Sequence, residues 1–101
     1  MQTNLNNVAK ELKVVVMYPE DKAEICPMPD TCIFYQGKQV GRINQTDVDD
    51  WQLITIGKDV FDVNVWLDDS VYLGEWKAAV YDHDDSTYAE IKNIEVINGD
   101  I

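Results

Sequence analysis

The chain has 101 residues, of which 46% are hydrophobic, and its 19 acidic and 8 basic residues give a net charge of −11. This length predicts one domain, residues 1–101, with enough apolar material for a single core. No apolar stretch approaches the roughly 18 residues of a membrane helix and no secretory signal is recognisable, so we expect a cytoplasmic protein without membrane contact. The acidic excess argues against direct nucleic-acid binding, because phosphate contacts require a surface of lysine and arginine.

The acidic excess lies entirely in the second half of the chain. Residues 1–46 contain five acidic and five basic residues, whereas residues 47–101 contain 14 acidic residues against three lysines. The net charge of −11 is therefore concentrated in residues 47–101 and exceeds the magnitude of about 2 to 8 that is usual for a small domain. Because like charges repel and destabilise a compact chain, this segregation predicts a functional use of the charge.

The first half predicts a short helix followed by three strands. Apolar residues recur at helical spacing in residues 4–12, with Thr3 or Asn4 available as N-cap. The β-branched run of residues 13–18 predicts a buried strand, which Pro19 ends because proline cannot donate to a strand ladder. After a connection over residues 19–30, residues 31–43 predict a hairpin that turns at Gly37.

Cys26 and Cys32 lie at the end of that connection and the start of the hairpin. The five residues between them do not fit a structural zinc site, and no second Cys/His pair completes one. An exported protein would join them in a small disulfide, but the absent signal favours two free thiols.

From residue 51 onward the sequence is typical of a β-meander. Four strands are predicted, at residues 51–56, 60–67, 71–81 and 87–97. Phe61, Val63 and Val65 alternate with polar residues, which is the period of a half-buried antiparallel strand. Turn residues such as the aspartates near residues 68–69 and 82–85 separate the strands.

The apolar residues of the meander define the expected core. Trp51 and Trp76 are predicted to be buried, Tyr72 shares the face of Trp76, and Gly74 indicates a bulge. The apolar residues of the last strand change parity, so a second bulge near residues 92–93 is needed to keep all four inside: Ala89, Ile91, Ile94 and Val96. The elements together predict a mainly β protein, a small antiparallel β-sandwich or barrel of six to seven strands with a possible short N-terminal helix.

The loop at residues 80–88 surrounds His83, the only histidine, with Asp82, Asp84 and Asp85. Its spacing resembles the start of a calcium loop, but the positions that require glycine and glutamate hold threonine and asparagine. Calcium binding would need further carboxylates, for which Asp68 and its neighbour in another turn are candidates. We predict instead a hairpin turn whose aspartates bind their own backbone, and no metal or cofactor.

Catalysis is not predicted. A nucleophilic enzyme would place serine or cysteine beside a histidine that a carboxylate holds, and both cysteines lie in the other half of the chain. No glycine-rich phosphate loop is present, and the abundance of acids makes any chosen carboxylate pair uninformative. We therefore expect a non-enzymatic protein.

A partner-binding surface is predicted instead, because some acids lie inside strands, where acidic residues are depleted. Trp66 shares the parity of Asp62, so it is either an exposed hot spot or packed against the helix or a loop. The predicted surface comprises acids and two aromatic anchors: Asp62, Trp66, Asp68, Asp69, Glu75, Asp82, Asp84, Asp85, Tyr88 and Glu90.

These features predict an acidic inhibitor that occludes a basic protein, such as a nuclease, a polymerase or another nucleic-acid-binding protein. The charge also permits DNA mimicry, and phage anti-defence proteins and immunity proteins fit this size and charge; a phage protein would act in the host cytoplasm. The alternative is a calcium- or ligand-binding β-module, or a structural subunit of a larger assembly such as a virion.

Overall fold

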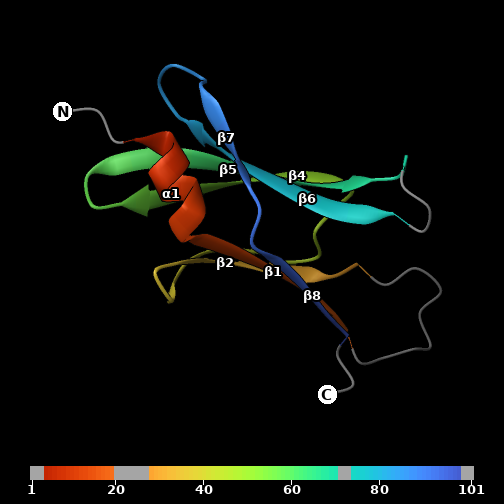
Figure 1. Cartoon of the computed structure of the whole chain (residues 1–101). Helices are drawn as coiled ribbons and strands as arrows, with labels where there is room; N and C mark the ends of the chain where they lie inside the picture. The colour runs from red at the N-terminus through yellow and green to blue at the C-terminus, as the bar shows by residue number, and fades with distance from the viewer. Residues whose placement is uncertain (1–3, 20–27, 71–73, 99–101) are drawn as a thin grey trace.

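The computed structural model describes residues 4–19, 28–70 and 74–98, which form two four-stranded sheets and one short helix. The first sheet has the strand order β3 (Lys38–Ile43), β2 (Asp30–Tyr35), β1 (Leu12–Tyr18), β8 (Ile94–Asn98). The second sheet has the order β4 (Asp49–Ile56), β5 (Asp59–Asp68), β6 (Glu75–Asp82), β7 (Tyr88–Ile91). The two sheets stack as layers of a small β-sandwich (Figure 1). The predicted fold class is confirmed.

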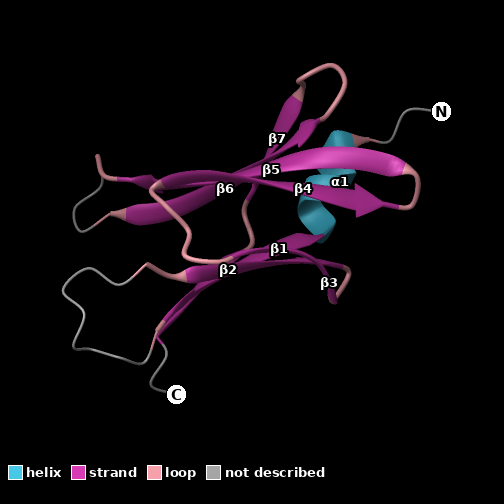
Figure 2. Cartoon of the chain, turned by 180° about the vertical axis from the view of Figure 1, so that it is seen from behind, coloured by secondary structure: helices cyan, strands magenta, loops and turns pink. Residues whose placement is uncertain are grey.

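The predicted helix is α1 (Leu5–Glu11), and Asn4 is its N-cap, with its side chain accepting a hydrogen bond of 3.0 Å from the backbone N–H of Asn6. The helix ends where Leu12 enters an extended conformation and begins β1. Val8 and Ala9 are buried, and α1 contacts β6 and β7. In both views α1 lies between the two layers, at one side of the sandwich (Figures 1 and 2).

The predicted hairpin of the first sheet is confirmed as β2 and β3. Gln36 and Gly37 both have positive φ, as the tight turn between twisted antiparallel strands requires. The other neighbour of β1 is β8, and these two strands run parallel. The sandwich is therefore mixed, whereas the sequence predicted purely antiparallel pairing.

The second sheet is the predicted meander, because each of its strands pairs antiparallel with the next along the chain. The alternation in β5 is confirmed, since Phe61, Val63 and Val65 are fully buried between the layers. Gly74 has a positive φ directly before β6 begins, so it marks the start of the strand and no bulge within it. Tyr72 lies outside the described residues.

The last predicted strand is in fact two strands in different sheets. β7 ends at Ile91, residues 92–93 carry the chain to the other layer, and β8 begins at Ile94. The change of parity reflects this crossing, so the predicted bulge at residues 92–93 is wrong and the fold has eight described strands. Ala89 and Ile91 are buried, as expected, but Val96 is 49% exposed.

The two tryptophans predicted for the core differ. Trp76 is 8% exposed, as predicted. Trp51 is 53% exposed, so its predicted burial is wrong. The register pairs Trp51 with Asn64, which lies on the opposite face of β5 from the core residues, and the inward side chain of β4 is Ile54.

Cys32 is buried in β2, and Arg42 Nη1 lies 3.7 Å from its Sγ. Cys32 is a free cysteine in the structure, whereas Cys26 lies outside the described residues. Within the described ranges, no helix has the length and apolar character needed to cross a membrane.

Candidate interaction surface on the second sheet

The charge excess of the chain falls on one of the two sheets. Residues 47–91, which form the second sheet with its turns and approaches, contain 12 acidic residues against Lys58 and Lys77. The sequence locates the excess in one half of the chain, residues 47–101, and the fold places residues 47–91 of that half in one layer. Glu95 is set apart, because it lies on β8 of the first sheet and pairs with Lys13 at 2.9 Å.

The outer face of the second sheet carries two rows of side chains that run across the strands. Because directly paired residues share a face, strand register defines each row. The first row is Trp51, Asn64, Ala79 and Glu90. The second row is Leu53, Asp62, Tyr81 and Tyr88. Each row therefore combines at least one aromatic side chain with a carboxylate.

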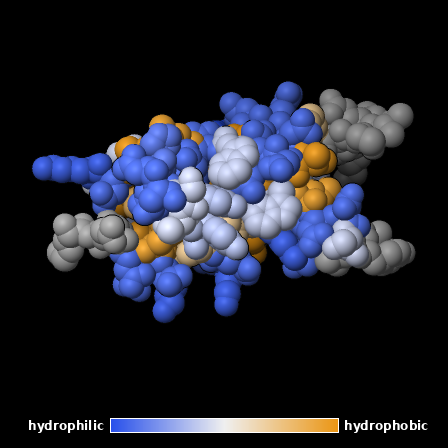
Figure 3. Space-filling model, turned by 90° about the horizontal axis from the view of Figure 1, so that it is seen from above, coloured by the Kyte–Doolittle hydropathy of each residue, from blue (hydrophilic) through white to orange (hydrophobic). Residues whose placement is uncertain are grey.

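Trp51 of the first row and Tyr88 of the second both contact the ring of Tyr81. We call these three residues, Trp51, Tyr81 and Tyr88, the aromatic row. The ring centroids of Trp51 and Tyr81 lie 5.0 Å apart, and those of Tyr81 and Tyr88 lie 5.2 Å apart in a stacked arrangement. Trp51, Leu53 and Tyr88 are 53%, 50% and 67% exposed. Seen from above, pale side chains of intermediate hydropathy run along the middle of this face between blue hydrophilic groups (Figure 3). An exposed aromatic strip with a polar rim is the composition of a binding hot spot.

Asn64 supports the aromatic row from below. It is buried, and its Nδ2 donates to Asp49 Oδ1 at 2.7 Å and to the backbone carbonyl of Asp50 at 3.0 Å. These bonds tie β5 to the start of β4, the segment that presents Trp51. The ring is thereby held on a rigid strand, which lowers the entropy cost of binding.

Trp66 lies on the same outer face but outside the aromatic row. It is half-buried, in register with Asp49 of β4 and Lys77 of β6. Neither predicted alternative describes it fully, since it is partly exposed and its register neighbours are strands rather than the helix. Tyr88, the other predicted anchor, is the most exposed ring of the aromatic row.

The loop at residues 80–88 is the predicted hairpin turn. Asp82 Oδ1 accepts hydrogen bonds from the backbone N–H groups of Asp84 and Asp85, and the Asp82 N–H closes the turn onto the Thr87 carbonyl. Asp85 Oδ1 accepts from both the N–H and the hydroxyl of Thr87, which lowers the pKa of the Asp85 carboxyl. Two of the three turn aspartates are therefore structural, whereas the Asp84 carboxylate accepts no hydrogen bond from the described residues.

His83 has a partner that the sequence did not reveal. Its Nδ1 lies 2.9 Å from Asp62 Oδ2, 21 residues earlier, and both side chains are partly exposed. The hydrogen bond to Asp62 is the main cause that raises the pKa of His83, and Asp84 and Asp82 add to it through their charge. A positive charge on His83 would neutralise one carboxylate beside the aromatic row.

Asp68 is held at the other end of β5 and β6. Its Oδ2 lies 2.7 Å from Lys77 Nζ, and its Oδ1 accepts hydrogen bonds from Ser70. The hydrogen bond from Lys77, and then those from Ser70, lower the pKa of Asp68 to about 2, and the same pair raises the pKa of Lys77. This predicted contact residue is thus already neutralised within the chain.

The ten predicted residues do not form one cluster. Asp62, Trp66, Tyr88 and Glu90 occupy the outer face of the second sheet, and Glu75 shares the parity of Lys77 on it. The turn aspartates are separated, because Asp68 pairs with Glu75 at one end of β6 and Asp82 lies at the other, roughly 24 Å away at about 3.4 Å per residue. The suggested convergence of Asp68 and Asp69 with the 80–88 loop on calcium is therefore wrong. In the described ranges, no three acidic, histidine or cysteine residues gather closely enough to hold a metal ion.

The fold and this surface define a small acidic β-sandwich with an exposed aromatic row on its charged layer. Comparison with protein-family models, with curated proteins and with solved structures found no match.

Proposed function

We propose that this protein is a non-enzymatic binding protein whose second sheet docks onto a basic protein and blocks it. The observation that carries the proposal is the coincidence of two features on one face. Trp51 and Tyr88 of the aromatic row are exposed, and the carboxylates of Asp62 and Glu90 lie in the same cross-strand rows as its rings.

Arginine fits this combination best among basic side chains. Its planar guanidinium stacks on an aromatic ring and at the same time forms paired hydrogen bonds with a carboxylate. Tyr88 and Glu90 are two residues apart on β7 and point to the same side, so one guanidinium can meet both. Distributed acids of the sheet would steer the basic partner toward this face and speed its association.

Docking is better supported than mimicry of DNA. The molecule measures 50 × 28 × 18 Å, and 50 Å of B-DNA carries about 30 phosphate charges, roughly 15 of them on one side. Residues 47–91 have a net charge of −10, from 12 acids and two lysines. The charge is thus about two thirds of that on one side of the duplex, and the centre of the face is aromatic instead of charged.

The proposed partner is a protein that handles nucleic acid, because such proteins concentrate arginine and lysine on their working surfaces. Covering that surface would exclude the nucleic acid sterically and electrostatically. A phage anti-defence protein acting in the host cytoplasm, or an immunity protein against a toxic nuclease, would use this mechanism.

The experiment is affinity capture by the immobilised full chain in about 0.05 M and 0.5 M salt, followed by an activity assay of each purified captured protein. We expect a basic protein that high salt releases and whose activity falls when the chain is added. Trp51→Ala combined with Tyr88→Ala should weaken capture at least tenfold. Glu90→Gln should also weaken it, whereas Glu95→Gln, the same change on the first sheet, should not.

Three outcomes would contradict the proposal. The first is the absence of any basic protein among those retained. The second is an equal loss of capture with Glu90→Gln and Glu95→Gln, which would show that the interaction depends only on the net charge of the chain. The third is an unchanged activity of the captured protein, which would leave a binding protein without inhibitory action.

A further inference from the structure

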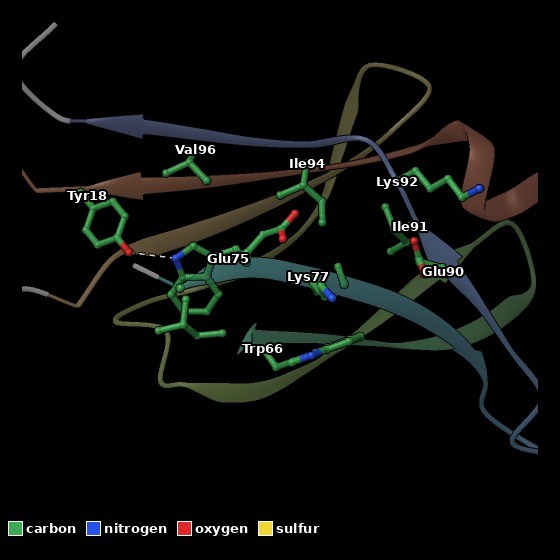
Figure 4. A pocket seen from close by; sticks show the side chains of 13 residues that line it. Tyr18, Trp66, Glu75, Lys77, Glu90, Ile91, Lys92, Ile94 and Val96 are labelled. Atoms are coloured by element: carbon green, nitrogen blue, oxygen red, sulfur yellow. Dashed lines mark hydrogen bonds between the residues drawn. The ribbon is translucent and has the colours of Figure 1, made fainter. Parts of the chain in front are cut away.

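A groove of about 580 Å³ lies on the open side of the sandwich, between β6 of the second sheet and β8 of the first. Its apolar lining includes Tyr18, Trp76, Ile94 and Val96. Figure 4 shows Ile94 and Val96 on β8 above the β6 segment that carries Glu75 and Lys77, with Tyr18 at one end. The dashed line at Tyr18 is the hydrogen bond that its hydroxyl accepts from Trp76 Nε1. The volume is in the range of ligand-binding clefts.

The groove exists because β7 is short. β7 pairs with β6 from Ala78 to Tyr81, and residues 92–93 then lead the chain into the first sheet. α1 contacts β7 and β6 and closes that part of the side. The remaining β6 segment, residues 75–77, pairs with β5 but with no described strand on its other edge.

Two backbone edges face this groove. Val14 N donates to Asn93 O at 3.0 Å. In a parallel ladder, this bond means that the backbone N–H and C=O groups of the odd-numbered residues of β8 point toward β1. The N–H and C=O of Val96 therefore point away from β1. On β6, the bond from Asp82 N to Thr87 O shows that the backbone N–H and C=O groups of even-numbered residues point toward the side of β7. The backbone groups of Trp76 point to the same side, where β7 no longer pairs with β6.

The side chains above the groove belong to the interior of the sandwich. Ile94 and Val96 pair with Val14 and Val16, which are fully buried between the layers. Val96 is nevertheless 49% exposed, and it lines the groove. An inward-facing apolar residue and an unpaired strand edge are thus uncovered at the same place.

We propose that this groove binds an extended segment of another polypeptide, which pairs with β8 as an additional strand of the first sheet. A strand is the ligand that satisfies a row of backbone groups and covers apolar side chains together. Its apolar residues would recur at every second position and enter the groove against Val96 and Trp76. β8 has five residues, so the segment would pair over roughly 17 Å.

Charge selects another protein as the occupant in preference to a second copy of this chain. Two carboxylates, Glu75 and Glu90, and two lysines, Lys77 and Lys92, border the groove, so its own lining is balanced in charge. β6, however, belongs to the layer that carries the acidic excess. Two copies joined along this edge would bring two such layers together, at a cost in repulsion. A foreign segment with basic residues at its solvent-facing positions meets no such cost.

The test uses a displayed library of random ten-residue peptides, selected on the intact protein in 0.5 M salt to suppress binding by charge alone. We expect enrichment of sequences with alternating apolar residues. The best peptide, once synthesised, should bind at least tenfold more weakly to Val96→Pro, which removes the outward N–H and leaves the bonds of β8 to β1. Val96→Thr, which keeps that N–H and the β-branched shape, should bind within threefold of the original protein.

Hydrogen exchange supplies an independent measurement on the unchanged protein. The amide of Val96 should exchange fast in the free protein and slowly with the peptide bound. N-methylation of the peptide at alternate residues should abolish binding in one register and spare it in the other, which keeps the test valid if Val96→Pro fails to fold.

Four results would overturn the inference. The selection could enrich no peptide, or the bound peptide could protect amides elsewhere and not that of Val96. Val96→Thr and Val96→Pro could weaken binding equally, or N-methylation of the peptide could leave its binding unchanged in both registers. A concentration-dependent dimer that Val96→Pro removes would assign the groove to a second copy and likewise overturn it. Trp51→Ala should leave peptide binding unchanged, so the two surfaces are tested separately.

Discussion

The indole Nε1 of Trp76 donates a 2.8 Å hydrogen bond to the hydroxyl of Tyr18, and this bond joins the two sheets across 58 positions of the sequence. Trp76 lies on β6 of the second sheet and Tyr18 at the end of β1 in the first. Both side chains also line the groove. The bond therefore holds the layers together at the place where the side of the sandwich is open.

Tyr18→Phe should lower the free energy of unfolding by about 1 kcal/mol, because it leaves the largely buried indole N–H without its acceptor. For a domain of this size the melting temperature should fall by roughly 4–8 °C. Urea and thermal unfolding measure both quantities. Tyr88→Phe is the matched control, since its exposed hydroxyl is solvated, and equal stability of the two variants would show that the bond to Tyr18 contributes nothing.

The pair of His83 and Asp62 should make stability depend on pH. The pKa of His83 is raised in the folded state, so the stabilisation is fully present below the unfolded pKa near 6.5 and is lost as pH rises through the folded pKa. Urea midpoints should fall across that window, and His83→Gln should flatten the dependence. NMR titration of this single histidine should give a midpoint above 6.5 that drops toward 6.5 in Asp62→Asn; an unchanged midpoint would refute the pairing.

Asp68 should contribute to resistance against acid. Its folded pKa of about 2 is below the ordinary value of 3.8, so its stabilisation is present above pH 4 and is lost as pH falls toward 2. Lys77→Met should raise the pKa of Asp68 and shift acid unfolding to higher pH. Carboxyl NMR titration checks the first effect and circular dichroism against pH the second. Lys58→Met, on the β4–β5 turn, is the control for the loss of one positive charge.

The turn after β6 should distinguish structural from free aspartates. Asp82→Ala removes the acceptor of two backbone N–H groups and should cost about 1 kcal/mol of unfolding free energy. Asp84→Ala should stay within about 0.5 kcal/mol, as for ordinary surface changes. Urea unfolding of both variants decides, and equal costs would contradict the assigned roles.

Much of the fold was predictable because its signals are local. The N-cap at Asn4, the turn at Gly37 and the alternation of Phe61, Val63 and Val65 each follow from a few neighbouring residues. The segregation of charge was also visible, since sequence halves and sheets nearly coincide. The exception is β8, which lies in the acidic half of the chain but belongs to the first sheet.

Features that depend on long-range register were not predictable. Trp51 and Ile54 have opposite parity in a strand with apolar residues on both faces, so only pairing with β5 decides which one is exposed. The contact of His83 with Asp62 requires knowledge of how β5 and β6 align. Of the three rings in the aromatic row, the sequence therefore points only to Tyr88, because Trp51 is predicted to be buried and Tyr81 is not singled out.

The parallel pairing of β1 with β8 has a consequence for synthesis on the ribosome. β1 emerges among the first elements and its partner among the last, after all four strands of the meander. The meander, whose pairs are local, can fold while one edge of β1 is still bare, and a bare edge is a template for pairing with other chains. A nascent chain stalled before residue 94 would therefore be prone to aggregation. Once β8 has been synthesised, it can cover the bare edge of β1 and protect the chain from aggregation.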